Sequence, residues 1–497
     1  MKFTNAIRPA MATMIISAAF AVATPAQAQG PAGSYGSGIA CTNLDTALPA
    51  TLVLTFYSID SDVVALSYTD PVQVPAGGSR NYFTPSSPPG LASGFLGSAV
   101  VSSDRALSCN VNTQVVSAGV GTAGTPYRAG SSAGLDSSQA SATVYAPQLM
   151  KKLAGTYDSY MALQNTDSAP IAVTVTYKDR NGNAFPAATE TFTIKGQATH
   201  VSYQASNANL PAGFLGGATV TSTGGKLVGA VAFYNSGTSA ATAQFHAYNT
   251  FAVGGPKLFA PRQVRNYYGY NSGLSIQNIG AAAAAVKITF TFAGQTFVVN
   301  SPAINPGATF SPFIANLPEL AGVDALAVGS RTGSAVIEGP AGSSFVAIAN
   351  EDNRGQYFSG ATGPAIPAEQ VGFGSTYNAM VDGTATNTVF FAQVPSKAGG
   401  FFSGGIQVAN ASATAGTCTI TYAGVAGATE SNVALAGNGA MSRFAPNVAN
   451  LIVAPATSFN SAVKVACTVP IYGISNFSAR STAAFGDSFI TANGLNQ

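Results

Sequence analysis

The chain has 497 residues, only 8% of them are charged, and its formal net charge is +2. Ordinary soluble domains carry roughly 25% charged residues. So few charges exclude the clustered Lys and Arg that nucleic-acid binding requires, and the polybasic face of a protein that binds anionic membranes. A weakly charged surface also lacks long-range repulsion, which permits self-association.

The N-terminus has the pattern of a secretory signal. Lys2 and Arg8 precede or flank the apolar stretch 11–23, and the small-x-small motif 26–28 predicts that the mature chain starts at Gln29. The apolar stretch is shorter than the roughly 20 residues that span a bilayer, which favours cleavage over an uncleaved membrane anchor. No later stretch is long enough, so we expect no membrane span in the mature chain. The predicted location is extracellular or at the cell surface, with the periplasm as an alternative.

A strand-like segment that ends in Asn recurs four times along the chain. The copies are Gly38–Asn43, Tyr160–Asn165, Gly273–Asn278 and Gly405–Asn410. The marker asparagines lie 122, 113 and 132 residues apart, which is about the size of one β-sandwich domain. Each copy is followed by an alternating apolar run and later by a second, small-residue strand, which indicates a tandem repeat.

The second repeat shows the secondary structure most clearly. Ile171–Tyr177 alternates apolar with small or polar residues, which is typical of a half-buried strand. Asp179–Asn183 then has the composition of a hairpin turn, and Thr191–Ile194 and Thr199–Tyr203 continue as strands. No window has a convincing helical pattern, so the predicted fold class is all-β, a tandem array of immunoglobulin-like β-sandwich domains.

The domain boundaries follow from the repeat and from Ala-Pro segments such as Ala146-Pro147 and Ala260-Pro261. Proline disfavours helix, so these segments are expected to be an edge strand or a short linker, and the array is expected to be a semi-rigid rod. The third repeat is predicted to carry an inserted loop or an extra strand pair near 360–383. The predicted units are a signal peptide at 1–28 and sandwich repeats at 29–145, 146–259, 260–391 and 392–497.

The four cysteines lie as one pair in the first repeat and one pair in the last. An even count in an exported chain favours disulfides over buried free thiols. Three connectivities are possible. Cys41–Cys109 and Cys418–Cys467 are favoured because the members of each pair share one core.

The sequence predicts no catalytic residue, no cofactor and no enzyme. Its two histidines, His200 and His246, lack the spacing of metal ligands and are expected at the surface. Gly130–Gly134 matches the G-x-S-x-G pattern of a serine nucleophile, but no helix follows it as that motif requires. A flexible loop is therefore the better interpretation.

One weak candidate for a metal site stands in the second repeat. Asp179, Asn181, Asn183 and Glu190 occupy positions 1, 3, 5 and 12 of an oxygen cage of the kind that wraps Ca²⁺. The glycine required at position 6 is replaced by Ala184. A plain hairpin turn explains the same residues equally well.

A dense aromatic and basic patch precedes the third marker segment. It consists of Tyr267, Tyr268, Tyr270, Arg262 and Arg265. Tyrosine rings beside arginine can stack on sugars, whereas packing between neighbouring domains is the alternative. The patch is therefore predicted as a ligand or interdomain surface.

The cassettes Gly94–Val100 and Gly213–Thr219 carry nearly the same sequence, GFLGSAV and GFLGGAT. With the fourfold repeat, they resemble the tandem immunoglobulin-like repeats of secreted bacterial surface proteins. The resemblance implies a non-enzymatic structural or adhesive role at the cell surface or in the extracellular matrix. The expected partners are a second copy of the chain or an envelope polysaccharide or protein. The alternative hypothesis is a polysaccharide-binding protein that uses clefts between repeats.

Overall fold

The structure is a computed structural model that describes residues 34–84, 86–116, 122, 126–237, 243–479 and 486–497, and the backbone of 12–16. The predicted signal peptide lies outside the described residues except for Ala12–Ile16, which forms strand β1. Within these ranges, none of the helices combines the length and apolar character needed to cross a bilayer.

The described chain is built almost entirely of antiparallel strands, which confirms the all-β prediction. The strands of the first repeat are β1 (Ala12–Ile16), β2 (Tyr35–Asn43), β3 (Leu52–Ser58), β4 (Val64–Thr69), β5 (Ser79–Phe83), β6 (Gly97–Ser103), β7 (Leu107–Val115), β8 (Ala129–Ala133) and β9 (Leu135–Asp136). Those of the second repeat are β10 (Thr143–Lys151), β11 (Tyr157–Asn165), β12 (Ile171–Asp179), β13 (Glu190–Ile194), β14 (Thr199–Tyr203), β15 (Phe214–Thr223), β16 (Leu227–Asn235) and β17 (Phe245–Asn249).

The third and fourth repeats follow the same plan. The third contains β18 (Lys257–Val264), β19 (Tyr270–Asn278), β20 (Lys287–Phe292), β21 (Gln295–Asn300), β22 (Thr309–Phe310), β23 (Thr332–Glu338), β24 (Phe345–Asn353), β25 (Gly374–Asn378) and β26 (Met380–Val381). The fourth contains β27 (Thr386–Ser396), β28 (Phe402–Asn410), β29 (Gly416–Tyr422), β30 (Glu430–Leu435), β31 (Ala440–Phe444), β32 (Phe459–Ala479), β33 (Ile490–Asn493) and β34 (Leu495–Asn496). Short 3₁₀ turns connect them: η1 (Ser137–Gln139), η2 (Pro186–Ala188), η3 (Gln204–Ser206), η5 (Ile314–Asn316), η6 (Pro318–Ala325), η7 (Val328–Ser330), η8 (Ala368–Gln370), η9 (Ala426–Ala428) and η10 (Ala445–Asn447).

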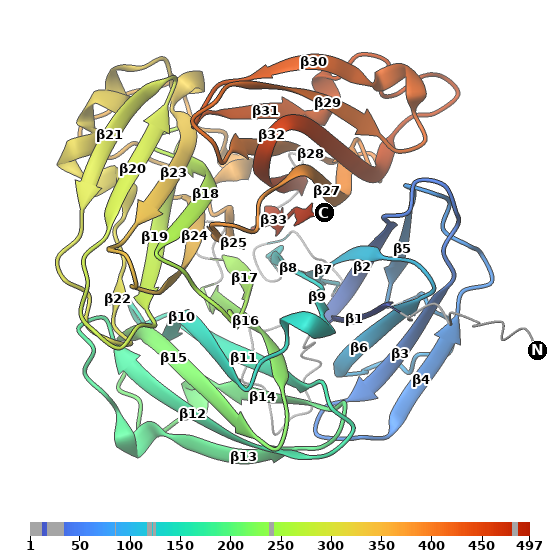
Figure 1. The fold of residues 1–497 in the computed structure, drawn as a ribbon, viewed down its shortest axis with the longest axis vertical. Coiled ribbons are helices and arrows are strands. Elements are labelled where there is room, and N and C mark those ends of the chain that lie inside the picture. Colours follow the sequence, from blue (N-terminus) through green and yellow to red (C-terminus); the bar gives the residue numbers. More distant parts are fainter. Residues whose placement is uncertain are drawn as a thin grey trace, which may run out of the picture.

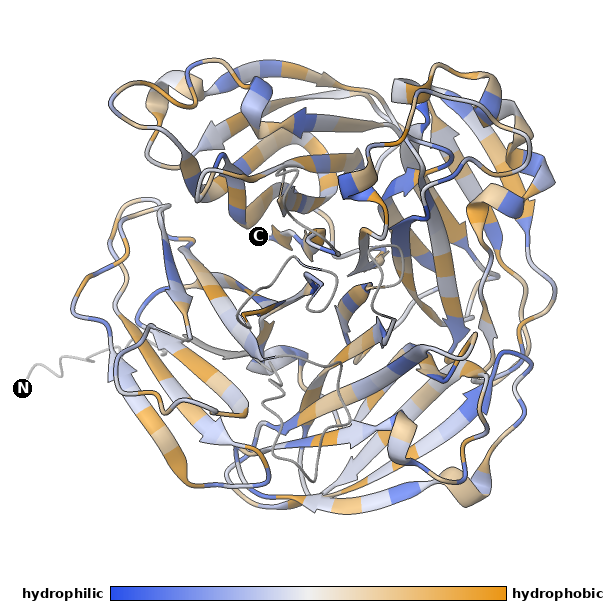
Figure 2. Ribbon diagram, turned by 180° about the vertical axis from the view of Figure 1, so that it is seen from behind, coloured by the Kyte–Doolittle hydropathy of each residue, from blue (hydrophilic) through white to orange (hydrophobic). Residues whose placement is uncertain are grey.

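Each of the first three repeats is a sandwich of two sheets, whereas the fourth is one eight-stranded sheet in which the long strand β32 pairs with strands of both layers. In the second repeat the sheets have the orders β10-β15-β12-β13 and β14-β11-β16-β17. The alternation read from the sequence sets the two faces: β12 buries Ile171, Val173, Val175 and Tyr177 and turns the residues between them outward. Figure 2 shows apolar and polar residues alternating along the outer strands in the same way.

The four marker asparagines explain why the repeat is visible in the sequence. Strands β2, β11, β19 and β28 each end on a marker, which is buried in every case. The Nδ2 of Asn165, for example, donates to the carbonyl oxygens of Ala169 at 2.7 Å and Lys195 at 3.0 Å, while its Oδ1 accepts from the Asp167 N–H at 2.9 Å. Equivalent bonds surround Asn43, Asn278 and Asn410, so the marker fixes the loop that leaves the strand.

The repeats do not form the predicted rod. They close into a ring, with one edge strand of every repeat at the centre (Figure 1). These inner strands, β8, β17, β25 and β33, contact one another in cyclic order, so the fourth repeat returns to the first. Direct bonds close the seam between them: Asn112 Nδ2 donates to Gln393 Oε1 at 2.6 Å, and the backbone N–H of Ala462 donates to Ser79 Oγ at 2.9 Å.

The Ala-Pro segments lie inside strands, in agreement with the strand alternative, and do not form linkers. Ala146-Pro147 is part of β10 and Ala260-Pro261 is part of β18, and in both strands the pairing register shifts just after the alanine. A bulge tolerates proline because the missing N–H has no ladder partner there. The predicted boundaries at 145/146, 259/260 and 391/392 thus cut through β10, β18 and β27. The range 360–383 contains two strands, β25 and β26, which pair with β24 and β18, so the strand alternative describes its second half.

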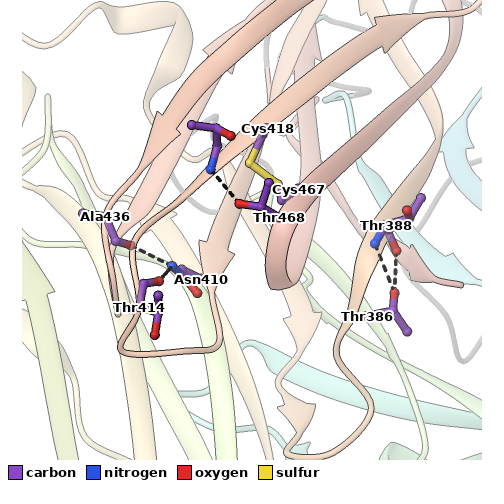
Figure 3. The surroundings of a disulfide bond; sticks show 9 residues. Thr386, Thr388, Asn410, Thr414, Cys418, Ala436, Cys467 and Thr468 are labelled. Atoms are coloured by element: carbon purple, nitrogen blue, oxygen red, sulfur yellow. Dashed lines mark hydrogen bonds between the residues drawn. A yellow bond between two sulfur atoms is a disulfide. The ribbon is translucent and has the colours of Figure 1, made fainter.

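Both favoured disulfides are present, Cys41–Cys109 and Cys418–Cys467. Each joins residues that stand directly opposite each other on neighbouring strands. The two bonds are not equivalent: the first links β2 to β7, which pairs with the inner strand β8, whereas the second links β29 to β32 away from the part of β32 that pairs with the inner strand β33. Figure 3 shows the second bond beside Thr468 and the marker Asn410. Thr468 Oγ1 accepts from the Thr417 N–H at 3.0 Å.

Candidate functional site

The centre of the ring is the place where all four repeats meet. Each inner strand pairs with one strand of its own repeat: β8 with β7, β17 with β16, β25 with β24 and β33 with β32. On its other side it faces the inner strand of the next repeat. Groups from all four repeats therefore converge along one axis, which makes this axis the candidate functional site.

A ladder of asparagines joins the inner strands where they end. Asn249 Nδ2 donates to the Ala133 carbonyl at 2.7 Å, and its Oδ1 accepts from the Ala133 N–H at 3.0 Å. Asn378 makes the same two bonds to the backbone of Asn249, at 2.6 and 3.0 Å. Asn493 makes them to Asn378, at 2.7 and 3.0 Å. Ala133 holds the fourth equivalent position, so the ladder has three rungs and one seam.

Asp487 joins the repeats at the opposite end of the inner strands. It is fully buried, and its carboxylate accepts from the N–H groups of Phe245, Gly374 and Phe489, each at 3.0 Å. Its own N–H donates to the Tyr127 carbonyl at 2.7 Å. One residue of the fourth repeat thus binds the backbone of the other three. Burial raises the pKa of Asp487 well above its usual value, against the backbone donors, which favour the charged form.

His246 lies beside this hub and is buried, so the prediction of a surface histidine is wrong for it. Its ring stacks on Phe233 at a centroid distance of 4.4 Å, and its Nδ1 lies 3.0 Å from Thr376 Oγ1 of the third repeat. Burial lowers its pKa from 6.5 to about 3. The other histidine, His200, is half-buried and contacts Asp60 Oδ1 of the first repeat at 2.7 Å.

A cavity of about 580 Å³ opens beyond the asparagine ladder. All four repeats contribute to its wall, which combines apolar side chains with amides and hydroxyls. Leu135, Val144, Phe251 and Val381 are among the apolar residues. Ser138 and Gln139 at the rim and the ladder asparagines supply uncharged hydrogen-bonding groups. The lining suits a neutral ligand with hydroxyl or amide groups.

The four calcium candidates belong to two separate hydrogen-bond networks. Asp179 Oδ1 accepts from the N–H groups of Asn181 at 2.8 Å and Asn183 at 2.9 Å, which is a hairpin turn. Glu190 instead accepts from Tyr177, Ser202 at 2.9 Å and Asn207 at 3.0 Å. Among the described residues, no three metal-ligating side chains of His, Cys, Asp or Glu gather at one point.

The aromatic and basic patch is only partly exposed: Arg265 is buried, Tyr268 is exposed, and the other three residues are half-buried. Arg262 forms a bidentate pair with Glu351 at 2.6 and 2.7 Å and also donates to Gln407 Oε1 of the fourth repeat at 3.2 Å. Burial opposes the charge of Arg262, but the Glu351 carboxylate raises its pKa above the usual value. Arg265 is fully buried against Asp324. The arginines are thus structural, and Arg262 has an interdomain role.

The tyrosines of the patch differ in their surroundings. Tyr267 stacks edge-on against Tyr268 at 4.9 Å and lies under the Arg262 guanidinium. Tyr268 is 39% exposed, the most open of the three. Tyr270 packs on Phe489 of the fourth repeat at 5.7 Å. Gly130–Gly134, the serine-nucleophile pattern, is the inner strand β8 and its following residue, not a loop.

Sequence reasoning missed the ladder and the hub. Asn249, Asn378 and Asn493 follow their marker asparagines by 84, 100 and 83 residues, an uneven spacing that hides the repeat. A shared Tyr-Asn pair at 248–249 and 377–378 is the signal that could have found two of them. Asp487 has no counterpart in the other repeats.

Comparisons with known proteins give no family. No family model matches the chain, and no curated protein matches it. A crystal structure of Thermotoga maritima 1070 matches 26% of this chain and 96% of its own at 18% identity, with a TM-score of 0.19. A crystal structure of a tetra-tandem repeat in the extending region of a large adhesion protein matches 92% of this chain and 95% of its own at 13% identity, with a TM-score of 0.12. Both TM-scores are too low to support an argument about this chain.

Proposed function

We propose that this is an exported, non-enzymatic structural or adhesive protein of the cell surface or extracellular matrix, built as a rigid ring of four β-sandwiches that associates with further copies of itself. The relationship to tandem immunoglobulin-like surface proteins is part of this proposal. Two disulfides and a weakly charged chain support export and self-association.

The observation that carries the proposal is the position of exposed apolar side chains. Half of the large exposed apolar residues in the described chain lie in the first repeat: Leu48, Val63, Val64, Val72 and Phe83, between 37% and 69% exposed. Val64 begins β4, the outer edge strand of its sheet. An open strand edge with apolar side chains is a surface on which another chain can pair.

Light scattering across a concentration series, with negative-stain imaging, tests this proposal on the chain from Gln29. We expect defined oligomers of rings that increase with concentration. The double variant Val63→Lys with Val64→Lys should remain a single ring, because lysine on an edge strand opposes pairing. The matched control is Val253→Lys with Val453→Lys, which adds the same two charges at positions of the second and fourth repeats that are 67% and 57% exposed. A single ring at every concentration would contradict self-association.

A second candidate function, binding of a polysaccharide, rests on the axial cavity, because its wall is built by all four repeats and offers neutral polar groups. A glycan array with the same protein tests it. Saturable binding that is lost on Ser138→Trp, which places a large ring at the exposed rim, would support a ligand-binding role. The same binding by Ser138→Trp would exclude this cavity.

A further inference from the structure

The first strand of every repeat occupies the same place, between two strands of its own sandwich. In the third repeat β18 lies between β23 and β26, and in the fourth β27 lies between β32 and β34. In the second repeat β10 pairs with β15, and Tyr145 bridges to Phe251 on the other side. In the first repeat this place lies between β6 and β9, and β1 holds it.

Strand β1 falls within the predicted export signal. Its register sets Met14 opposite Val101 and Asp136, and Ile15 opposite Val100 and Leu135. The segment 1–28 that contains β1 is the one expected to be removed after Ala28. The strand that completes the first sandwich is therefore lost when the chain matures.

The mature chain has no residues left to replace it. In the second, third and fourth repeats, five residues connect the first strand to the next: 152–156, 265–269 and 397–401. Only six residues, 29–34, stand between the predicted cleavage site and the start of β2 at Tyr35. Six residues are enough for the connection to β2, but they leave none to form a strand between β6 and β9.

We propose that the mature protein carries a slot one strand wide between β6 and β9, and that this slot binds an extended segment of another polypeptide in trans. The proposal rests on the export and cleavage assumed in the proposed function. Strand addition of this kind takes its affinity from backbone hydrogen bonds and its specificity from alternate side chains.

The walls of the slot define what it accepts. Both neighbouring strands run antiparallel to the occupant, so the segment must offer N–H and C=O groups on both edges and contain no proline at the paired positions. Ala99 and Val101 of β6 face the core that contains Phe56 and Leu54. The occupant therefore needs apolar residues at the two alternate positions opposite them.

A buried hydroxyl marks the end of the slot. Ser98 Oγ, one residue beyond Ala99 on β6, is fully buried and has no hydrogen-bond partner. A polar side chain near that end of the occupant would satisfy it. The expected partner is thus an uncharged, proline-free strand of five or six residues with two alternating apolar side chains.

Peptide binding to the chain 29–497 tests the slot. The probe is a peptide of residues 11–19 with terminal lysines for solubility, and the matched control carries proline in place of Ile15. We expect saturable binding of the probe, a rise in Tm, slowed hydrogen exchange in β6 and at least tenfold weaker binding of the proline peptide. Equal binding of both peptides, or none, would overturn the proposal.

A second variant fills the slot in cis. The probe sequence 11–19, followed by the five-residue connection 152–156 of the second repeat, is fused directly before Tyr35 in place of 29–34. This variant should melt at a higher temperature than 29–497 and should not bind the probe. A variant that melts no higher and still binds would contradict the slot. Oligomers of 29–497 that vanish in the filled variant would identify a second copy as the occupant.

The two proposals fail separately. Mass spectrometry of the exported protein shows whether 1–28 is removed, and a retained leader would contradict export processing while leaving the peptide test on 29–497 valid. Association through Val63 and Val64 persists in the filled variant, whereas association through the slot does not.

Discussion

At the scale of residues, the ring depends on amide groups that replace strand pairing at the axis. The inner strands are joined by side-chain bonds from Asn249, Asn378 and Asn493 to the backbone of the preceding repeat. Each rung satisfies one N–H and one C=O that would otherwise be left unpaired. Buried backbone groups without partners cost free energy, so the rungs stabilise closure.

Removing one rung should loosen one junction. Asn378→Ala leaves the N–H and C=O of Asn249 unpaired, and we expect the free energy of unfolding to fall by about 2–4 kcal/mol. Chemical denaturation measures it. The control, Asn387→Ala, removes an exposed asparagine and should change stability by less than about 0.5 kcal/mol. Equal effects of the two variants would show that the rung contributes nothing.

The seam at Ala133 permits the opposite experiment. Ala133→Asn supplies the fourth rung toward the backbone of Asn493, and the expected gain is about 1 kcal/mol. The gain should disappear in chains that also carry Asn378→Ala only if the rungs act cooperatively. A loss of stability would show that the seam has no room for an amide.

His246 should make the protein sensitive to acid. Its pKa is about 3 in the folded chain against 6.5 when unfolded, so the unfolded state binds the proton first. The free energy of unfolding is therefore unaffected by protonation of His246 above pH 6.5. It falls by up to about 5 kcal/mol as the pH drops from 6.5 toward 3. Melting curves recorded between pH 7 and 4 should show that Tm falls as the pH falls. The slope of Tm against pH should be smaller in the His246→Gln variant. His200→Gln, which removes the chain's other histidine, should retain the slope.

At the scale of elements, the sequence predicts strands well and their connections poorly. The marker asparagines and the alternating runs locate β2, β11, β12, β19 and β28 because burial of one sheet face demands period-two alternation. The Ala-Pro segments are ambiguous because proline lacks an N–H both in a linker and in a bulge. Only the partner strand distinguishes the two, and that partner, β15 or β23, lies about 70 residues away along the chain.

The disulfides should stabilise the two end repeats by similar amounts. Their sequence separations of 68 and 49 residues correspond to about 4 kcal/mol each in the chain-entropy model. Replacing Cys41 and Cys109 by alanine should lower the Tm, and so should the same change at Cys418 and Cys467. Thermal melts with and without reductant measure this. Reductant should have no effect on the chain that lacks all four cysteines.

At the scale of the whole molecule, the sequence misses the ring. The contacts that close it join residues 281 and 383 positions apart, such as Asn112 with Gln393 and Ser79 with Ala462. These are ordinary polar residues with no shared motif. Asp487, the hub of the candidate site, occurs once, so the repeat pattern gives no indication of it. The axial site could therefore not be predicted, whereas the four sandwiches could.

Small-angle X-ray scattering distinguishes the ring from a rod. A compact chain of this length has a radius of gyration of roughly 23 Å, and we expect the dilute protein to match it. Four sandwiches in a line would give a much larger value and a distance distribution with a long tail. The Val63→Lys with Val64→Lys variant is the suitable sample, since it should remain a single ring.

The position of Asp487 sets an order in time. The fourth repeat is translated after the other three. The N–H groups of Phe245 and Gly374 therefore lack their acceptor, the Asp487 carboxylate, while the earlier repeats fold. A chain that ends before Asp487 cannot make these bonds. The backbone junction that Asp487 makes between the repeats can therefore form only after residue 487 has been translated.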